Sequence, residues 1–274
     1  MRSRIGPEGC WLIAALPALA FIAAPIVALL QNSSVKNFID QVRDDQVVDA
    51  IGVSLRTSSV AILVIVVFGL PLAIYDGRFN RNSPRSAAGI LRQIIRGILL
   101  LPAVLPPAAA GLGLLFAFGR QSEIGGYLER LGVHVAFSPC AVVLAQVFVA
   151  FPFFLFQASA AFARHEDEID DAAAIDGAGA FSVIRKVLIP VHWRALVGAA
   201  LLSWARALGE FGATLLFAGS LQGRTRTLPL AIYLGFETDL SGATTVAIIL
   251  LMVASAVLLL SALVLGFGKR RLFT

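Results

Sequence analysis

The chain has 274 residues, of which 58% are hydrophobic and only 14% are charged, and its mean hydropathy is +0.85. Soluble domains are about half apolar and a quarter charged, so this composition excludes an ordinary soluble protein and indicates a polytopic protein of the lipid bilayer. The net charge of +5 does not indicate nucleic-acid binding, because the basic residues lie in loops between apolar segments, where membrane orientation explains them.

Six apolar stretches are long enough, at about 20 residues, to cross a membrane as helices. We therefore expect an all-α fold with six transmembrane helices. The stretches are Trp11–Leu30, Ser54–Tyr75, Ile94–Phe118, Phe137–Phe162, Leu196–Ser220 and Ala243–Phe267. The first could instead be a signal peptide, since Ala18-Leu19-Ala20 resembles a cleavage site. Its apolar run continues to Leu30, which favours an uncleaved helix.

The loops alternate in their content of lysine and arginine. Both ends of the chain and the second and fourth loops together hold fourteen of these residues, whereas the other three loops hold seven. Loops rich in basic residues stay in the cytoplasm. This predicts that both termini and the polar stretch Asp171–Pro190 are cytoplasmic.

Proline interrupts the third expected span at Pro102, Pro106 and Pro107, which cannot lie in a straight helix. A broken helix is tolerated in a bilayer only where protein or a water-filled cavity satisfies the freed backbone groups. The breaks therefore indicate either kinked helix packing or a translocation path shaped by these bends.

The fifth expected span contains two charges, Arg206 and Glu210, four residues apart on one helix face. Charges at this depth are costly unless they pair or face water, so we expect both to point into the protein. One interpretation is a structural ion pair. The other is that Arg206 attracts an anion while Glu210 holds its side chain in place. The glycines at 198, 209, 212 and 219 would let neighbouring helices approach closely.

Motifs for catalysis are missing from the sequence. There is no Gly-x-x-x-x-Gly-Lys-[Ser/Thr] phosphate loop, no Gly-x-Ser-x-Gly elbow and no His-Glu-x-x-His pair, and the three histidines lack metal-ligand spacing. The acidic residues before Asp171 are better explained by a solvated helix start than by a paired-carboxylate catalyst. We expect no catalytic residue, no metal site and no cofactor bound by this chain.

The polar stretch carries a spaced motif: Asp171-Ala172-Ala173, three residues, Gly177, nine residues, and then Val187-Leu188-Ile189-Pro190. It resembles the EAA loop of ABC-importer permease subunits, whose pattern is Glu-Ala-Ala, three residues, Gly, nine residues, Ile-x-Leu-Pro. The departures are Asp for Glu, Val for Ile and Ile for Leu. The alternative is an ordinary cytoplasmic helical hairpin.

The resemblance implies the fold of a type I ABC importer permease with a cytoplasmic coupling helix, in a bacterial or archaeal inner membrane. Residues 1–50 would form an N-terminal helix and external loop, 51–268 the permease core and 269–274 a short basic tail. The expected partners are a second copy of the chain, two ATP-binding subunits that use the ATP, and an extracytoplasmic oxyanion-binding protein. The family places the ATPase contact at Asp171, Ala172, Ala173 and Gly177, with Pro190 redirecting the chain.

Three further segments resemble the molybdate and sulfate permease group: Leu100–Pro107 with the glycines that follow it, Ala205–Thr214 with Phe217–Gly219, and Gly223–Tyr233, which is most like molybdate or tungstate permeases. We therefore expect an oxyanion importer, with molybdate or tungstate as substrate. Another permease of this type, for sulfate, thiosulfate or another solute, and an ATP-independent transporter or channel are the alternatives. By chemistry and position, the candidate path residues are Pro106, Pro107, Ser203, Arg206, Glu210 and Thr214.

Overall fold

The computed structural model describes residues 7–33, 35–79, 87–165 and 179–266. Every regular element in this part of the chain is a helix, so the predicted all-α class is confirmed. Four helical runs are long and apolar enough to cross a membrane. They are α3 (Asp45–Phe79), α7 (Pro139–Phe162), the run of α9 (Ala180–Val183), η2 (Ile184–Leu188) and α10 (Ile189–Leu208), and α13 (Leu240–Gly266).

The third expected span is broken, as its prolines predict. It consists of α4 (Ala87–Leu100), the short helix η1 (Leu101–Ala103) and α5 (Pro107–Phe118), with a bend of 112° between its two halves. Helix α1 (Pro7–Gln31) counts only as a shorter apolar helix, over Ala15–Gln31. The described residues therefore hold four spans, or five with the bent one, and the predicted count of six is not confirmed.

The expected fifth span differs from the structure. Helix α10 ends at Leu208, and a separate short helix, α11 (Gly212–Ala218), follows after a break. Gly209 caps α10 and Phe211 leaves the helical conformation, so the apolar run is not one continuous helix. Three short helices lie in the expected loops: α2 (Val35–Val42), α6 (Glu123–Arg130) and α12 (Leu228–Thr238).

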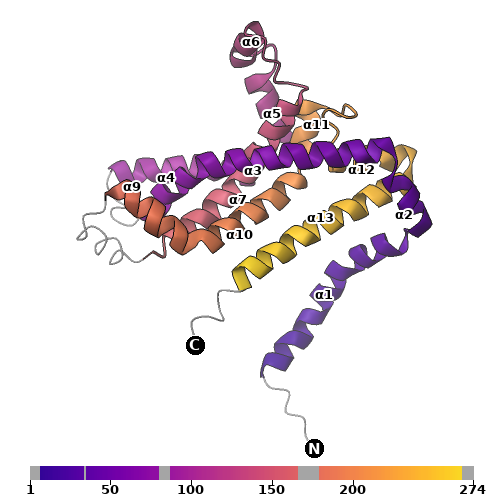
Figure 1. Cartoon of the computed structure of the whole chain (residues 1–274), viewed down its shortest axis with the longest axis horizontal. Coiled ribbons are helices and arrows are strands. Elements are labelled where there is room, and N and C mark those ends of the chain that lie inside the picture. The colour runs from indigo at the N-terminus through magenta and orange to yellow at the C-terminus, as the bar shows by residue number, and fades with distance from the viewer. Residues whose placement is uncertain (1–6, 34, 80–86, 166–178, 267–274) are drawn as a thin grey trace, which may run out of the picture.

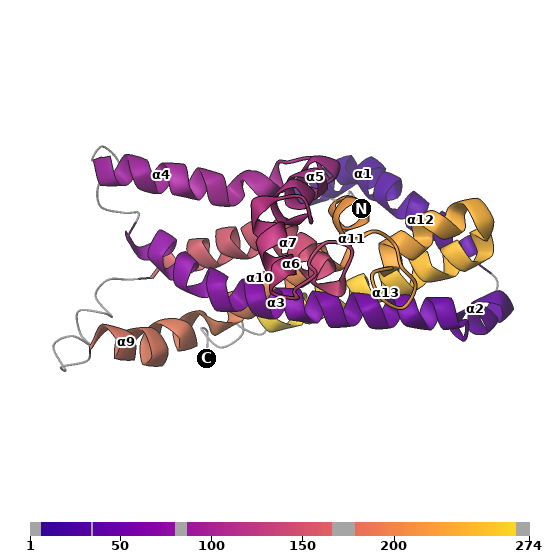
Figure 2. The same ribbon diagram turned by 90° about the horizontal axis from the view of Figure 1, so that it is seen from above.

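Helices α3, α7 and α10 all pack against one another, and α3 runs along the longest axis of the molecule (Figures 1 and 2). Helices α5 and α6 project from this bundle on one side, and α11 lies at their base (Figure 1). Helix α1 contacts α13 but diverges from the other long helices.

Small residues bring α3 and α7 together. A Cβ added to Gly69 would lie 2.8 Å from the Phe154 ring, and one added to Gly77 would lie 2.6 Å from the Ser159 carbonyl oxygen. Glycine permits this backbone approach, as is usual between membrane helices. Gly77 follows Gly69 along α3, and its contact Ser159 follows Phe154 along α7, so the two helices are parallel.

Buried serines on α3 tie two other helices to it. The Ser54 hydroxyl accepts a hydrogen bond of 2.7 Å from the backbone N–H of Leu228, at the start of α12. The Ser58 hydroxyl accepts one of 2.8 Å from the indole N–H of Trp204 on α10. These bonds satisfy polar groups that the apolar interior would otherwise leave unpaired.

Candidate functional site

The predicted ATPase-coupling residues fall mostly outside the described part of the chain. Asp171, Ala172, Ala173 and Gly177 all lie outside the described residues. Pro190 is the exposed second residue of α10. The described helix continues through Pro190 instead of being redirected there. A π-helical turn, η2, comes just before it, and such a wider turn relieves the clash between a proline ring and the preceding carbonyl groups.

Two histidines join the helices on either side of the coupling segment. His165, just beyond the end of α7, is 4% exposed, and its Nδ1 lies 3.2 Å from Nε2 of His192 on α10. The His192 ring also packs edge-on against Phe162, with ring centroids 5.5 Å apart. The sequence does not predict this contact, because the two histidines lie 27 positions apart in the chain. Their proximity follows only from the packing of α7 on α10.

The predicted pairing of Arg206 with Glu210 is confirmed. The Arg206 guanidinium donates to Oε2 of Glu210 at 2.9 Å. The second oxygen, Oε1, accepts from the backbone N–H of Ala213 at 2.9 Å. The Glu210 side chain is 1% exposed and that of Arg206 is 31% exposed. The carboxylate thus links the end of α10 to the start of α11, whereas the guanidinium reaches the surface beside the Phe153 ring.

The breaks in the third and fifth spans meet in space. A Cβ added to Gly212, the first residue of α11, would lie 2.7 Å from Cβ of Pro107, the first residue of α5. One added to Gly111, a turn further along α5, would lie 2.9 Å from Cα of Ala213. The two short helices therefore pack closely, and we refer to them as the α5–α11 pair.

The other two predicted path residues lie on different helices. Ser203 is buried on α10 and donates to the carbonyl of Ala150 on α7 at 2.8 Å. Thr214 is buried in α11, and its hydroxyl makes no hydrogen bond with any described residue. The break after Leu208 separates these residues into two elements, so the six candidates do not share one helix face.

The sequence predicts close approach at four glycines, and two of them lie at the start and the end of α11. Gly212 meets α5 as described, and Gly219, with φ of +67°, lies against the Phe137 ring. Gly198 packs on the Leu265 side chain of α13. Gly209 meets only carbonyl oxygens of its own helix. The prediction of close approach between helices therefore holds for Gly198 and Gly212, since Phe137 lies in the loop before α7 and Gly209 meets no other element.

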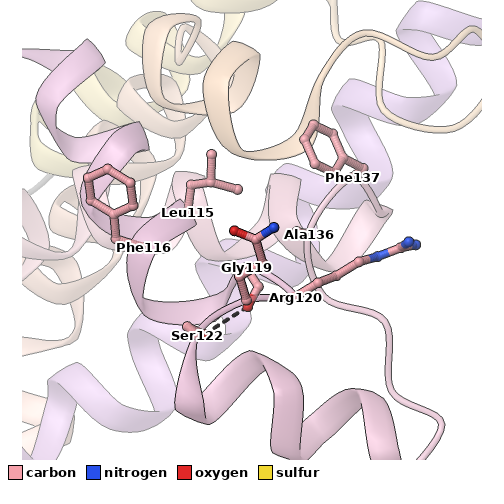
Figure 3. A pocket seen from close by; sticks show the side chains of 8 residues that line it. Leu115, Phe116, Gly119, Arg120, Ser122, Ala136 and Phe137 are labelled. Carbon is pink, nitrogen blue, oxygen red and sulfur yellow. Dashed lines mark hydrogen bonds between the residues drawn. The ribbon is translucent and has the colours of Figure 1, made fainter.

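A cavity of about 470 Å³ opens at the far end of the α5–α11 pair (Figure 3). It lies between the end of α5, the turn into α6 and the loop before α7, with Phe116, Arg120 and Phe137 in its wall. Phe137 has φ of 58°, a conformation that is strained for a bulky residue. Arg120 forms an ion pair of 3.4 Å with Glu129 of α6, which partly neutralises its charge.

Comparison with known proteins gives the family. Residues 67–271 match the model of the "binding-protein-dependent transport system inner membrane component". The chain is 39% identical over 258 residues to the molybdenum transport system permease protein ModB of Mycobacterium tuberculosis, covering 93% of this chain and 92% of that protein. It is 32% identical over 228 residues to the sulfate transport system permease protein CysW of Escherichia coli, covering 82% and 75%.

A solved structure shares the fold. It is a bacterial alginate ABC transporter in complex with a periplasmic protein that holds an alginate pentasaccharide. The superposition has a TM-score of 0.68 at 19% identity and covers 96% of this chain and 95% of that one. With several apolar helices of spanning length, the chain is a multi-pass membrane protein. It belongs to the family of inner membrane components of binding-protein-dependent transport systems, and it has the fold of an ABC transporter permease.

Proposed function

We propose that this chain is the membrane-spanning subunit of an ATP-driven importer of an oxyanion, with molybdate or tungstate as the substrate. The observation that carries the proposal is the identity with ModB, which extends over nearly the full length of both chains. The relation to CysW is weaker and makes sulfate the alternative substrate.

The charges at the break between α10 and α11 support an anionic substrate. Arg206 lies in the last turn of α10, two residues before this spanning run ends at the break, and about a third of its side chain is exposed. A guanidinium within a spanning run is too costly to face lipid, so we infer that it faces water or another protein surface. Among the described residues, Glu210 is the carboxylate that pairs with Arg206, and it also accepts a hydrogen bond from the backbone N–H of Ala213, which partly compensates its negative charge. Arg206 is thus the group that meets an anion on the translocation path.

The assembly we propose has two copies of this chain, two ATP-binding subunits in the cytoplasm and an external binding protein that delivers the substrate. Both termini and the coupling segment lie in the cytoplasm. ATP draws the two ATPase subunits together and moves the coupling segments. The contact between His165 and His192 transmits this motion to α7 and α10 together. The chain itself hydrolyses no ATP.

Uptake by reconstituted transporter tests the substrate. The chain, its ATPase and its binding protein are placed in proteoliposomes, and labelled molybdate uptake is measured with tungstate, sulfate or thiosulfate as competitors. We expect ATP-dependent molybdate uptake that tungstate inhibits more strongly than sulfate does. Stronger uptake of sulfate than of molybdate would contradict the substrate we propose.

A transporter or channel of a different class would need no ATPase. Vesicles that contain only this chain distinguish the two classes. We expect no movement of molybdate down an ion gradient in such vesicles. Movement without the ATPase would overturn the ATP-driven mechanism as a whole.

A further inference from the structure

Gln146 is a buried polar side chain of α7 without a hydrogen-bond partner among the described residues. It lies on α7, its exposure is 0%, and neither its Nε2 nor its Oε1 makes a hydrogen bond with any described residue. Buried side-chain amides are normally paired, because an unpaired one loses its bonds to water without replacement. A contribution to the stability of the fold therefore does not explain why a glutamine occupies position 146.

A buried glutamine in a helix can also donate a hydrogen bond to a carbonyl of its own helix, but Gln146 does not do so. Gln157, on the same helix, donates its side-chain N–H to the carbonyl of Phe153, four residues earlier, at 3.2 Å. The unpaired hydroxyl of Ser159 can likewise turn toward a carbonyl of α7. Gln146 makes no bond of this kind, so its amide is held away from the carbonyls of α7.

The neighbours of Gln146 on its helix face locate the amide. Residues three and four positions away share one face of a helix. Val142 and Val149 pack in the same cluster as Ala213 and Phe217 of α11. Ala150 accepts the hydrogen bond from Ser203 of α10. The face that carries Gln146 therefore adjoins both α10 and α11, at the level of the break between them.

The chemistry at this break suits an anion with several oxygens. The carboxylate of Glu210 is already bound by Arg206 and by the N–H of Ala213. Among the described residues near this break, the groups left without partners are the amide of Gln146 and the hydroxyl of Thr214, and each can donate a hydrogen bond. A tetrahedral oxyanion accepts hydrogen bonds and donates none when fully ionised.

We propose that the side-chain amide of Gln146 donates a hydrogen bond to the oxyanion as it passes the break between α10 and α11. The proposal rests on the function proposed above and adds a residue that determines which substrate is carried. In this structure residues of α5 and α11 pack with Val142 and Val149, on either side of Gln146 along α7, and the breaks before Pro107 and after Leu208 would let the α5–α11 pair move away from α7. Gln146 then replaces one of the water molecules that the anion has shed.

The test compares three variants of the complete transporter in proteoliposomes, with molybdate and sulfate as the probes. Gln146→Met keeps the length of the side chain and removes its donor, and Gln146→Asn keeps the amide. Ser159→Ala is the matched control, because it removes another buried, unpaired polar group from the same helix nearer its other end. Uptake rate, ATP hydrolysis, assembly with the ATPase and melting temperature are measured for each.

We expect Gln146→Met to lower the molybdate uptake rate by about tenfold or more, which is the value of one hydrogen bond to a charged group. Assembly and basal ATP hydrolysis should stay unchanged, and the melting temperature should be unchanged or higher. Gln146→Asn should recover part of the uptake, and Ser159→Ala should transport normally.

Normal uptake by Gln146→Met would overturn the proposal, as would an equal loss in Ser159→Ala. Failed assembly of Gln146→Met would also overturn it, because it would show that the amide stabilises the fold. If the wild-type transporter carries neither probe, the proposed function fails, whatever the variants do.

Discussion

Arg206 and Glu210 form a pair whose members are buried very differently. Glu210 is 1% exposed and receives two hydrogen bonds, whereas Arg206 keeps 31% of its side chain exposed. Removing one partner from a buried pair is costly mainly because the other charge remains without compensation. The loss of Arg206 therefore affects stability more than the loss of Glu210 does.

The first prediction follows from this asymmetry. Arg206→Met should lower the free energy of unfolding in detergent by about 3 kcal/mol, because it leaves the Glu210 carboxylate buried without a counterion. Glu210→Gln should cost less, since the amide oxygen still accepts from Ala213 and Arg206 is partly solvated. The double variant should recover part of the loss in a double-mutant cycle. Equal losses in the two single variants would contradict this account.

At the scale of elements, the α5–α11 pair is where two broken spans support each other. Each helix begins after a break, and each presents a glycine to the other. Transporters commonly form their substrate sites where membrane helices are discontinuous, near the middle of the bilayer. The exposed Pro106 and Pro107 lie at one of these breaks, and Glu210 lies at the other.

The second prediction concerns this contact. Gly111→Ala places a Cβ 2.9 Å from both Cα and the carbonyl oxygen of Ala213, so α5 and α11 must separate. We expect a loss of about 1–3 kcal/mol in stability, together with impaired uptake. Gly113→Ala on the same helix is the control, because nothing lies within 4 Å of its added Cβ. Melting temperatures decide the point, and a similar fall in both variants would count against the close packing.

The third prediction concerns the helices that flank the coupling segment. His192→Leu removes the ring nitrogen that lies 3.2 Å from His165. We expect ATP hydrolysis to continue while molybdate uptake per ATP falls severalfold, because the contact between the end of α7 and the start of α10, beside the coupling segment, is lost. His134→Leu is the control, since that histidine is exposed and lies beside Glu129 near α6. An unchanged ratio of uptake to ATP hydrolysis would show that the histidine contact transmits no motion.

For the assembly as a whole, we propose that the chain works with a separate ATPase, and the coupling motif is the predicted contact. The fourth prediction is that Gly177→Glu abolishes binding of the ATPase while the chain still inserts into the membrane, because a bulky charge would lie at the contact. Gly179→Glu adds the same charge two residues beyond this glycine and serves as the control. Co-purification measures binding, and wild-type recovery of the ATPase with Gly177→Glu would refute the assignment.

The sequence determined by itself the features that depend on local chemistry. Apolar runs of spanning length predict helices whatever surrounds them, because a backbone in lipid must satisfy its own hydrogen bonds. The break at Pro106 and Pro107 follows from the missing N–H of proline. The pairing of Arg206 with Glu210 is predicted from their separation of four residues, although Glu210 lies in the break beyond the end of α10 and the two residues do not share one helix face.

Only the tertiary structure decided the features that depend on packing. The break after Leu208 has no proline to signal it, and it is stabilised by the bond from Ala213 to Glu210 and by the contact of Gly212 with Pro107. The contact of His165 with His192 joins residues 27 positions apart. Gln146 appears as one polar residue in an apolar run, and only the packing of α7 against its neighbours shows that its amide is buried without a partner. Helical periodicity relates residues within one helix, whereas contacts between helices depend on which faces pack together.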